Sequence, residues 1–150
     1  KSEPLAPRHL CTVTKAESEL LFKQRGVRVD LSDLGKDIVV YADQALSQLV
    51  WNLLENAVIH NPRPDNEKSV IVSGSISGDI FTLSVSDNGA GISDDKKTEI
   101  FNPSRRYGGV GLHLVRRLAE KYGSTPRVKD RVEGQPDEGL KVEIDFKIVK

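Results

Sequence analysis

Two asparagines four residues apart, Asn52 and Asn56, lie in a largely apolar stretch, "WNLLENAVIHN", that is expected to be helical. Asparagine is a mediocre helix former, because its amide competes for nearby backbone groups. With Gln48, the two form one polar row at i, i+4 and i+8, beside an apolar stripe. An amide oxygen is a neutral, hard ligand suited to Mg²⁺. The row therefore either presents amide groups to a metal in a cleft or simply faces solvent.

A carboxylate follows a strand-like stretch, "FTLSVSDNGAGIS". The alternation of apolar residues along this strand puts Asp87 on the face expected to be buried. A buried carboxylate needs hydrogen-bond donors, and the exocyclic amine of a ligand such as adenine would supply one. Gly89 and Gly91 would let the backbone turn tightly and approach that ligand. The alternative is an Asn-Gly turn in which Asp87 caps its own loop.

A glycine-rich stretch, "YGGVGLHL", precedes and opens another expected helix. The unpaired N–H groups and the dipole of a helix N-terminus favour an anion. Gly108, Gly109 and Gly111 therefore indicate either a phosphate site or a flexible linker. Arg105 and Arg106, just before them, are either phosphate contacts or a solvated pair.

The elements that must position these residues follow from hydrophobic periodicity. Helices are expected over 5–25, 43–60 and 111–122, and strands over 27–31, 37–42, 69–76, 79–87 and 140–148. This pattern predicts an α+β two-layer sandwich, with helices covering one face of a mostly antiparallel sheet. Residues 1–150 are expected to form a single domain, with residues 1–10 as boundary or linker. Lys97, in a polar segment after the glycines, is expected at the surface.

Composition limits the classes of function. Lys plus Arg and Asp plus Glu both number 22, and a zero net charge argues against a nucleic-acid or anionic-membrane surface. The single cysteine, Cys11, cannot form an internal disulfide, so a reducing cytosol is expected. No apolar run approaches the roughly 20 residues that span a bilayer. Because the chain contains no methionine, we expect a piece of a longer protein, and the sequence leaves open whether that parent is membrane-anchored.

The three motifs, in this order, resemble those of the GHKL ATPase and kinase superfamily, and specifically the catalytic ATP-binding domain of sensor histidine kinases. "NLLENAVIHN" is similar to the asparagine box, "DNGAGI" to the first glycine box, "IFNPS" to the phenylalanine box and "GGVGLHL" to the second glycine box. The resemblance runs from about Pro4 to the C-terminus. It implies the Bergerat fold, with about five strands under three helices, and ATP and Mg²⁺ as ligands.

The resemblance also implies roles for individual residues. Asn56 would hold the Mg²⁺ that bridges the phosphates, with Asn52 supporting the same phosphate region. Asp87 would accept a hydrogen bond from the adenine amino group, with Gly91 contacting the ring nearby. Further residues implied at the nucleotide pocket are His60, Gly89, Ile92, Arg105, Arg106, Gly109, Val110, Gly111 and Leu112.

Asn52 also separates the members of this superfamily. The resembling hydrolases of the gyrase, mismatch-repair and chaperone kinds, and the anti-sigma-type serine kinases, carry a glutamate there as general base. An amide cannot take a proton, whereas an attacking histidine needs less help, so histidine kinase is favoured. A degenerate nucleotide-binding or interaction domain stays open, because His113 replaces a usual glycine, Ile59 replaces a common lysine, and the ATP lid is short.

The phosphoacceptor half of the reaction is expected outside this chain. None of the three histidines, His9, His60 and His113, is followed by an acidic residue in the family's phosphoacceptor pattern. The resemblance therefore implies a dimerisation domain of the same parent protein as phosphate acceptor and a downstream response regulator. Neither nucleic acid nor membrane contact is expected of this domain.

Overall fold

The computed structural model of the chain describes residues 4–59, 61–100 and 112–150. The helices within these ranges are α1 (Leu10–Arg25), α2 (Leu46–Ile59) and α3 (Leu112–Lys121). The strands are β1 (Ala6–His9), β2 (Val29–Asp33), β3 (Val39–Ala42), β4 (Val70–Ser77), β5 (Ile80–Asp87), β6 (Arg127–Val132) and β7 (Gln135–Lys147). Two short 3₁₀ turns, η1 (Asp65–Glu67) and η2 (Asp94–Lys96), lie in the connections.

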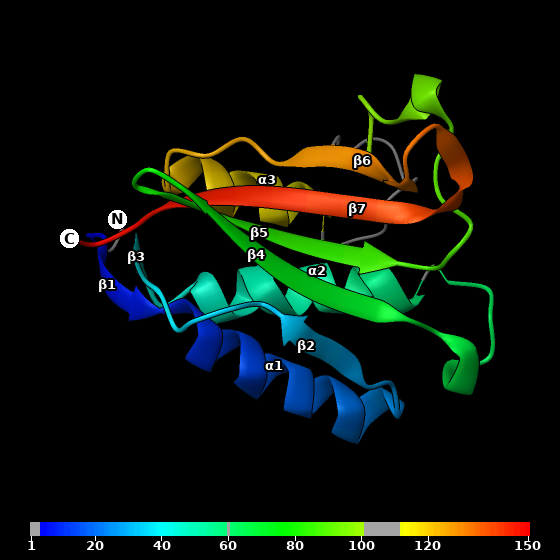
Figure 1. Cartoon of the computed structure of the whole chain (residues 1–150), viewed down its shortest axis with the longest axis horizontal. Coiled ribbons are helices and arrows are strands. Elements are labelled where there is room, and N and C mark those ends of the chain that lie inside the picture. Colours follow the sequence, from blue (N-terminus) through cyan, green and yellow to red (C-terminus); the bar gives the residue numbers. More distant parts are fainter. Residues whose placement is uncertain (1–3, 60, 101–111) are drawn as a thin grey trace.

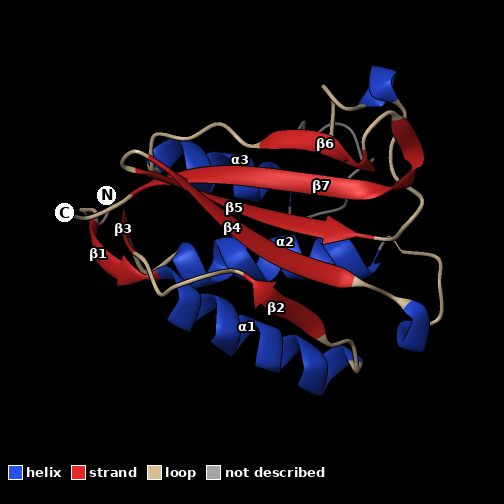
Figure 2. Cartoon of the chain, viewed as in Figure 1, coloured by secondary structure: helices blue, strands red, loops and turns tan. Residues whose placement is uncertain are grey.

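The main sheet has the strand order β2-β4-β5-β7-β6. Its β2–β4 pair is parallel and its other pairs are antiparallel, which confirms the predicted mixed, mostly antiparallel sheet. A smaller sheet pairs β1 with β3, and a bridge between Val40 and Ile148 joins it to the C-terminal end of the chain. The three helices cover one face of the main sheet, so the predicted α+β two-layer architecture is confirmed (Figures 1 and 2).

The core lies between α2 and the inward faces of β5 and β7. Phe81, Leu83 and Val85 are buried, as the alternation along β5 predicts. The apolar stripe expected on α2 is also buried; it consists of Leu46, Leu49, Val50, Leu53 and Ala57. Gly74 makes room for this packing, because a Cβ there would overlap the Phe81 ring and the Leu34 carbonyl oxygen.

Asp43 caps the N-terminus of α2 and also joins this end to the end of α3. Its Oδ1 accepts hydrogen bonds from the Ala45 N–H (3.0 Å) and the Tyr122 hydroxyl (2.6 Å), and its Oδ2 pairs with Lys121. Burial alone would raise the pKa of the Asp43 carboxyl, but the hydrogen bonds from Lys121 and Tyr122 outweigh it and hold the pKa below its ordinary value. Burial and the hydrogen bond to Asp43 raise the pKa of Tyr122.

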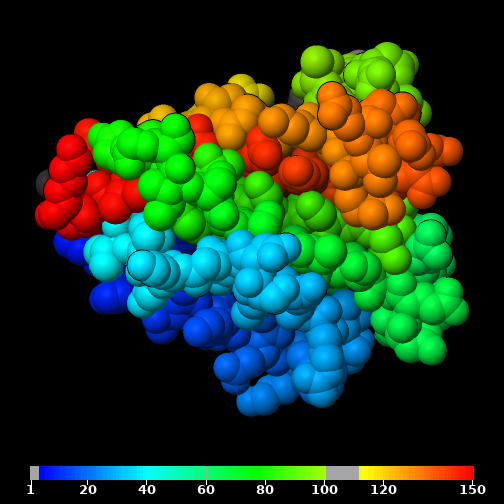
Figure 3. Space-filling view, viewed as in Figure 1, coloured from blue at the N-terminus to red at the C-terminus, as the bar shows by residue number. Residues whose placement is uncertain are grey.

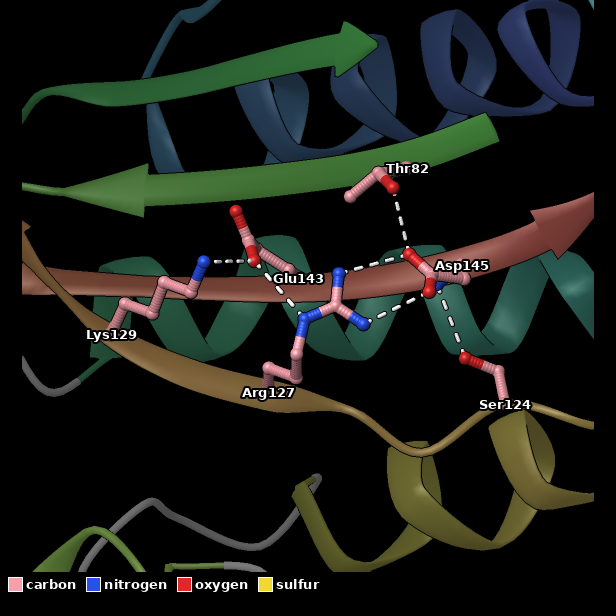
Figure 4. A network of polar contacts seen from close by, with 6 residues as sticks. All are labelled: Thr82, Ser124, Arg127, Lys129, Glu143 and Asp145. Atoms are coloured by element: carbon pink, nitrogen blue, oxygen red, sulfur yellow. Dashed lines mark hydrogen bonds and ion pairs between the residues drawn. The ribbon is translucent and has the colours of Figure 1, made fainter. Parts of the chain in front are cut away.

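A polar network on the other face of the sheet joins β5, β7 and β6 (Figure 4). Arg127 donates two hydrogen bonds of 2.9 Å to the Asp145 carboxylate, and the Thr82 hydroxyl donates a third at 2.7 Å. Glu143 pairs with both Arg127 (3.2 Å) and Lys129 (3.0 Å). The hydrogen bond from Arg127 is the main cause that lowers the pKa of Asp145. Paired charges thus fix the pairing of the last three strands without burying apolar residues on this face.

Three expectations about the elements were wrong. Residues 6–9 form β1 rather than a linker, because they pair with β3, and α1 therefore begins at Leu10. The polar segment "RVKDRV" forms β6, which has no apolar alternation because its charged side chains pair across the strands. The last strand begins at Gln135, before the alternation starts.

None of the helices in the described ranges has the length and apolarity needed to cross a membrane.

Candidate nucleotide and metal site

The predicted site residues that the structure describes lie at one end of the molecule. The C-terminal ends of α2 and β5 and the N-terminal end of α3 point to this end (Figure 1). A hydrogen bond of 2.7 Å from the Asn61 amide to Asn88 Oδ1 joins the segment after α2 to the segment after β5. The fold therefore brings the asparagine motif and the D-x-G-x-G motif side by side.

The asparagine row on α2 is only partly solvated. Gln48 is exposed, whereas Asn52 and Asn56 are half-buried. Asn52 Nδ2 and Asn56 Oδ1 are buried and have no hydrogen-bond partner within the described residues. Such atoms are rare in native structures, and each costs about 1–3 kcal/mol. The alternative in which both side chains simply face solvent does not fit these atoms.

The two unpaired atoms are of opposite kinds. Asn52 offers an N–H group, which suits a phosphate oxygen, and Asn56 offers an oxygen, which suits a hard cation such as Mg²⁺. Within residues 4–59, 61–100 and 112–150, no three His, Cys, Asp or Glu side chains are grouped so that they could hold a metal ion. A cation that is held by Asn56 would complete its shell with phosphate oxygens and water, as Mg²⁺ commonly does. The residues present therefore fit Mg²⁺ bound together with a phosphate ligand.

Asp87 ends β5 and is half-buried. Its Oδ1 accepts hydrogen bonds from the backbone N–H groups of Gly89 (2.9 Å) and Leu140 (3.3 Å). The capping of its own loop, which the sequence left as an alternative, is therefore present. These bonds also fix the orientation of the carboxylate at the end of the strand, so loop capping does not conflict with a role in binding.

Packing within the chain requires a glycine at one of the two glycine positions of this loop. Gly91 has a φ of 69°, and a Cβ there would overlap the Pro136 carbonyl oxygen in β7. A Cβ at Gly89 would lie 3.0 Å from Asp87 Oδ1, which is a tight but smaller conflict. The structure thus gives Gly91 a reason other than the expected ligand contact, namely close approach to β7.

Lys97 is not the surface residue that the sequence predicts, because its side chain is 15% exposed. Its Nζ donates to the Ile92 carbonyl (2.9 Å) and pairs with Asp94 (2.5 Å) and with Asp130 of β6 (2.8 Å). Burial alone would lower the pKa of Lys97, but Asp130 and Asp94 outweigh it and raise the pKa above its ordinary value. Ile92, a predicted pocket residue, packs partly buried against the core.

The remaining predicted residues divide into two groups. Leu112 begins α3 and is fully buried, and His113 next to it is half-buried. Ile59 ends α2 and is 48% exposed. The residues that lie outside the described ranges are His60, Arg105, Arg106, Gly108, Gly109, Val110 and Gly111.

Sequence reasoning missed the hydrogen bonds that hold the two motifs together. Asn61 is 5% exposed, and Asn88 accepts from its amide and from the Ser69 N–H (2.9 Å). The Asn88 amide donates to the Glu67 carbonyl (2.9 Å), and Arg63 Nε donates to the Asn88 carbonyl (2.9 Å). No local pattern signals these bonds, because the two asparagines are 27 residues apart in the chain.

Comparison with known proteins finds relatives for most of the chain. Residues 42–150 match the family model described as histidine kinase-, DNA gyrase B-, and HSP90-like ATPase. The swarming motility regulation sensor protein RssA of Serratia marcescens is 35% identical over 127 residues, which cover 79% of this chain and 26% of RssA. The chain thus spans about a quarter of the length of the curated relatives that it matches, or less.

Solved structures show the same fold. The mycobacterial sensor histidine kinase MprB aligns with a TM-score of 0.84 at 22% identity, over 96% of this chain and 97% of that one. The histidine kinase ThkA, in complex with the response regulator protein TrrA, aligns with a TM-score of 0.78 at 17% identity, over 97% of this chain and 42% of that one. At these identities the likeness concerns the fold.

Proposed function

The chain belongs to the family of histidine kinase-, DNA gyrase B- and HSP90-like ATPases, and we propose that it is the ATP-binding catalytic domain of a sensor histidine kinase. In this proposal the domain binds ATP with Mg²⁺ and donates the γ-phosphoryl group to a histidine on a separate dimerisation domain of the same parent protein. A response regulator would then take the phosphoryl group. We propose the cytoplasm as the place where the domain acts.

The observation that carries this proposal is a pair of buried atoms on α2, Asn52 Nδ2 and Asn56 Oδ1, for which the described residues supply no hydrogen-bond partner. Asn56 would hold Mg²⁺ through its oxygen, and Asn52 would donate a hydrogen bond to a phosphate oxygen. When bound, Mg²⁺ neutralises charge on the phosphates, which is its main contribution to phosphoryl transfer. The role of the two asparagines is to place the triphosphate with respect to the incoming histidine.

Asp87 would select the base. Its carboxylate is oriented by the Gly89 and Leu140 N–H groups, and it would accept a hydrogen bond from the amino group of adenine. Guanine carries a carbonyl at that position, so two acceptors would face each other and the hydrogen bond to the base would be lost. The further proposed contacts at the nucleotide are Gly89, Gly91, Ile92 and Leu112, with His60, Arg105, Arg106, Gly109, Val110 and Gly111.

Asn52 favours transfer to histidine over hydrolysis or transfer to serine. An amide at this position cannot accept the proton of water or of a hydroxyl group. A neutral imidazole needs no such base, since its nitrogen already carries the attacking lone pair. A degenerate domain that binds nucleotide without transferring phosphate is the second candidate, favoured by the half-buried His113 at the start of α3.

The nucleotide proposal is tested by titration calorimetry with non-hydrolysable analogues of ATP and GTP, each in the presence of Mg²⁺. The proposal predicts binding of the adenine analogue and much weaker binding of the guanine analogue. Equal affinity for the two would contradict the role of Asp87, and binding of neither would contradict the proposed function itself.

A further inference from the structure

The end of the β6–β7 hairpin packs against the segment that follows β5, from Asp87 to Lys97. Figure 3 shows the surface of this segment, in yellow-green, against the hairpin end, in orange. The pairing of β5 with β7 ends at Ser86, which lies opposite Lys141. The first residues of β7 instead contact the loop that carries Gly89 and Gly91.

Two contacts join the start of this loop to β7. The Leu140 N–H donates to Asp87 Oδ1 (3.3 Å), and a Cβ on the neighbouring Gly139 would overlap the Asp87 carbonyl oxygen. Further along, Gly91 lies so close to Pro136 that only a glycine fits. Backbone contact with β7 thus holds both Asp87 and Gly91.

A third contact joins the end of this loop to β6, and it depends on one side chain. Lys97 lies after η2, and its Nζ reaches back to the Ile92 carbonyl (2.9 Å) and across to Asp130 of β6 (2.8 Å). The side chains of Lys97 and Asp130 are 15% and 13% exposed, so water and salt screen this ion pair only in part. The backbone bonds of η2 run from Lys96 to Ser93 and from Lys97 to Asp94, and they do not link the turn to the sheet.

We propose that Lys97 is a positioning residue, which clamps the Ile92 carbonyl to β6 through Asp130 and so holds the loop from Asp87 to Ile92 in its nucleotide-binding shape. This inference rests on the proposed function, because it concerns the base end of the same site. Lys97 acts through the backbone of Ile92 and is not assigned any contact with the nucleotide. Its partner Asp130 belongs to a strand that the sequence did not reveal.

The clamp has specific consequences for binding. Loss of the ammonium group leaves Asp130 without this ion pair and the Ile92 carbonyl without its donor, so the loop should sample other conformations. The clamped loop faces the base and not the phosphates. The affinities for AMP, ADP and ATP should therefore fall by the same factor. The gain in affinity that Mg²⁺ gives ATP should stay unchanged, since Asn56 lies on another element.

The experiment compares Lys97→Ala, Asp130→Asn and the exchanged pair Lys97→Asp/Asp130→Lys with the wild type. Lys129→Ala is the matched control. Lys129 lies on β6, as Asp130 does, and like Lys97 it pairs with a carboxylate, that of Glu143, at 3.0 Å. Each variant is checked by circular dichroism and then titrated with AMP and ADP. Hydrogen exchange is measured over residues 88–95 without nucleotide.

We expect Lys97→Ala and Asp130→Asn each to lower the affinity for AMP and ADP about 3- to 10-fold, which is the range for a partly buried ion pair. Hydrogen exchange over residues 88–95 should quicken. The exchanged pair should not recover the affinity, because an aspartate at position 97 cannot donate to the Ile92 carbonyl and would face Asp94. A merely structural lysine would lower the thermal midpoint without changing the affinity of the folded domain. Wild-type affinity in both single variants would overturn the clamp alone, whereas failure of the wild type to bind AMP or ADP would overturn the proposed function and the clamp with it.

Discussion

Asn52 and Asn56 lie one helical turn apart on α2, and each buries one polar atom that has no partner within the described residues. A donor and an acceptor left unpaired in this way cost about 1–3 kcal/mol each. A ligand that satisfies both would recover that free energy on binding. At the residue scale, this makes the pair the strongest local reason to expect Mg²⁺ and phosphate at the end of α2.

The role of Asp87 predicts the effect of an isosteric change. Asp87→Asn keeps an oxygen that can accept from Gly89 and Leu140, so the loop should keep its shape. It removes the charge from the hydrogen bond to adenine, which should cost about 1.5–3 kcal/mol in the free energy of nucleotide binding. Titration calorimetry measures this loss. Lys36→Ala, at an exposed position between β2 and β3, is the control, and equal affinities for the two variants would sink the adenine assignment.

The role of Asn56 predicts a change in metal dependence. Asn56→Ala should abolish the difference in ATP affinity between solutions with and without Mg²⁺, because it removes the proposed oxygen ligand. Its circular dichroism should match that of the wild type. Gln48→Ala, the exposed member of the same row, should keep the full Mg²⁺ dependence. If Asn56→Ala keeps it too, the metal is held by other residues.

At the scale of the elements, Asp43 couples the start of α2 to the end of α3. Both helices carry residues proposed for the site. Asn56 in the last turn of α2 and Leu112 at the start of α3 lie toward the end opposite to Asp43, whereas Asn52 lies midway along α2. The contacts of Asp43 with Lys121 and Tyr122 therefore set how the two helices lie along each other. This carboxylate stabilises the fold and is not part of the proposed site.

Asp43→Asn should therefore reduce stability in a way that depends on pH. It weakens charge-assisted hydrogen bonds from Lys121 and Tyr122, which should cost about 1.5–3 kcal/mol of unfolding free energy at pH 7. The folded-state pKa of Asp43 lies below its ordinary value of 3.8, so its stabilisation is present above that pH and is lost as the pH falls through the folded-state pKa.

Urea denaturation from pH 7 down to pH 3 measures this effect. The difference between wild type and Asp43→Asn should be largest at pH 7 and shrink below about pH 4. Asp33→Asn is the control, because Asp33 is an exposed aspartate at the end of β2. A destabilisation by Asp43→Asn that is no larger than that of Asp33→Asn, or that does not change with pH, would show that the cap is not a charged one.

The sequence predicted elements wherever burial imposes a period. The stripe on α2 and the alternation of β5 and β7 gave the layers, the hairpin and the α+β class, because these faces must be apolar. β1 and β6 escaped prediction, since β1 is short and β6 is fixed by paired charges. The prediction that Lys97 lies at the surface was wrong because its carboxylate partner, Asp130, is distant in sequence.

The candidate site was predictable in its residue types and only partly in its geometry. The spacing of Asn52 and Asn56 and the position of Asp87 could be read directly, because helix and strand periods fix where side chains point. That Gly91 is required by Pro136, and that Asn61 binds Asn88, could not be read, since both depend on contacts between segments far apart in the chain.

At the scale of the whole molecule, the proposed function makes this chain one part of a two-part reaction. It spans about a quarter or less of the length of its curated relatives. The proposed acceptor histidine lies on another domain, and Asn52 offers no base to activate water. The lone domain should therefore bind ATP, hydrolyse it very slowly and leave itself unlabelled.

The most direct test is phosphoryl transfer in trans. The domain is incubated with γ-labelled ATP and Mg²⁺, with and without the cognate dimerisation domain. That domain is supplied at high concentration, because tethering normally provides about millimolar effective concentration. Asn56→Ala serves as the inactive control. The account predicts label on the dimerisation domain alone, labile in acid and stable in alkali as phosphohistidine is. Acid-stable label, or rapid ATP hydrolysis by the lone domain, would contradict it.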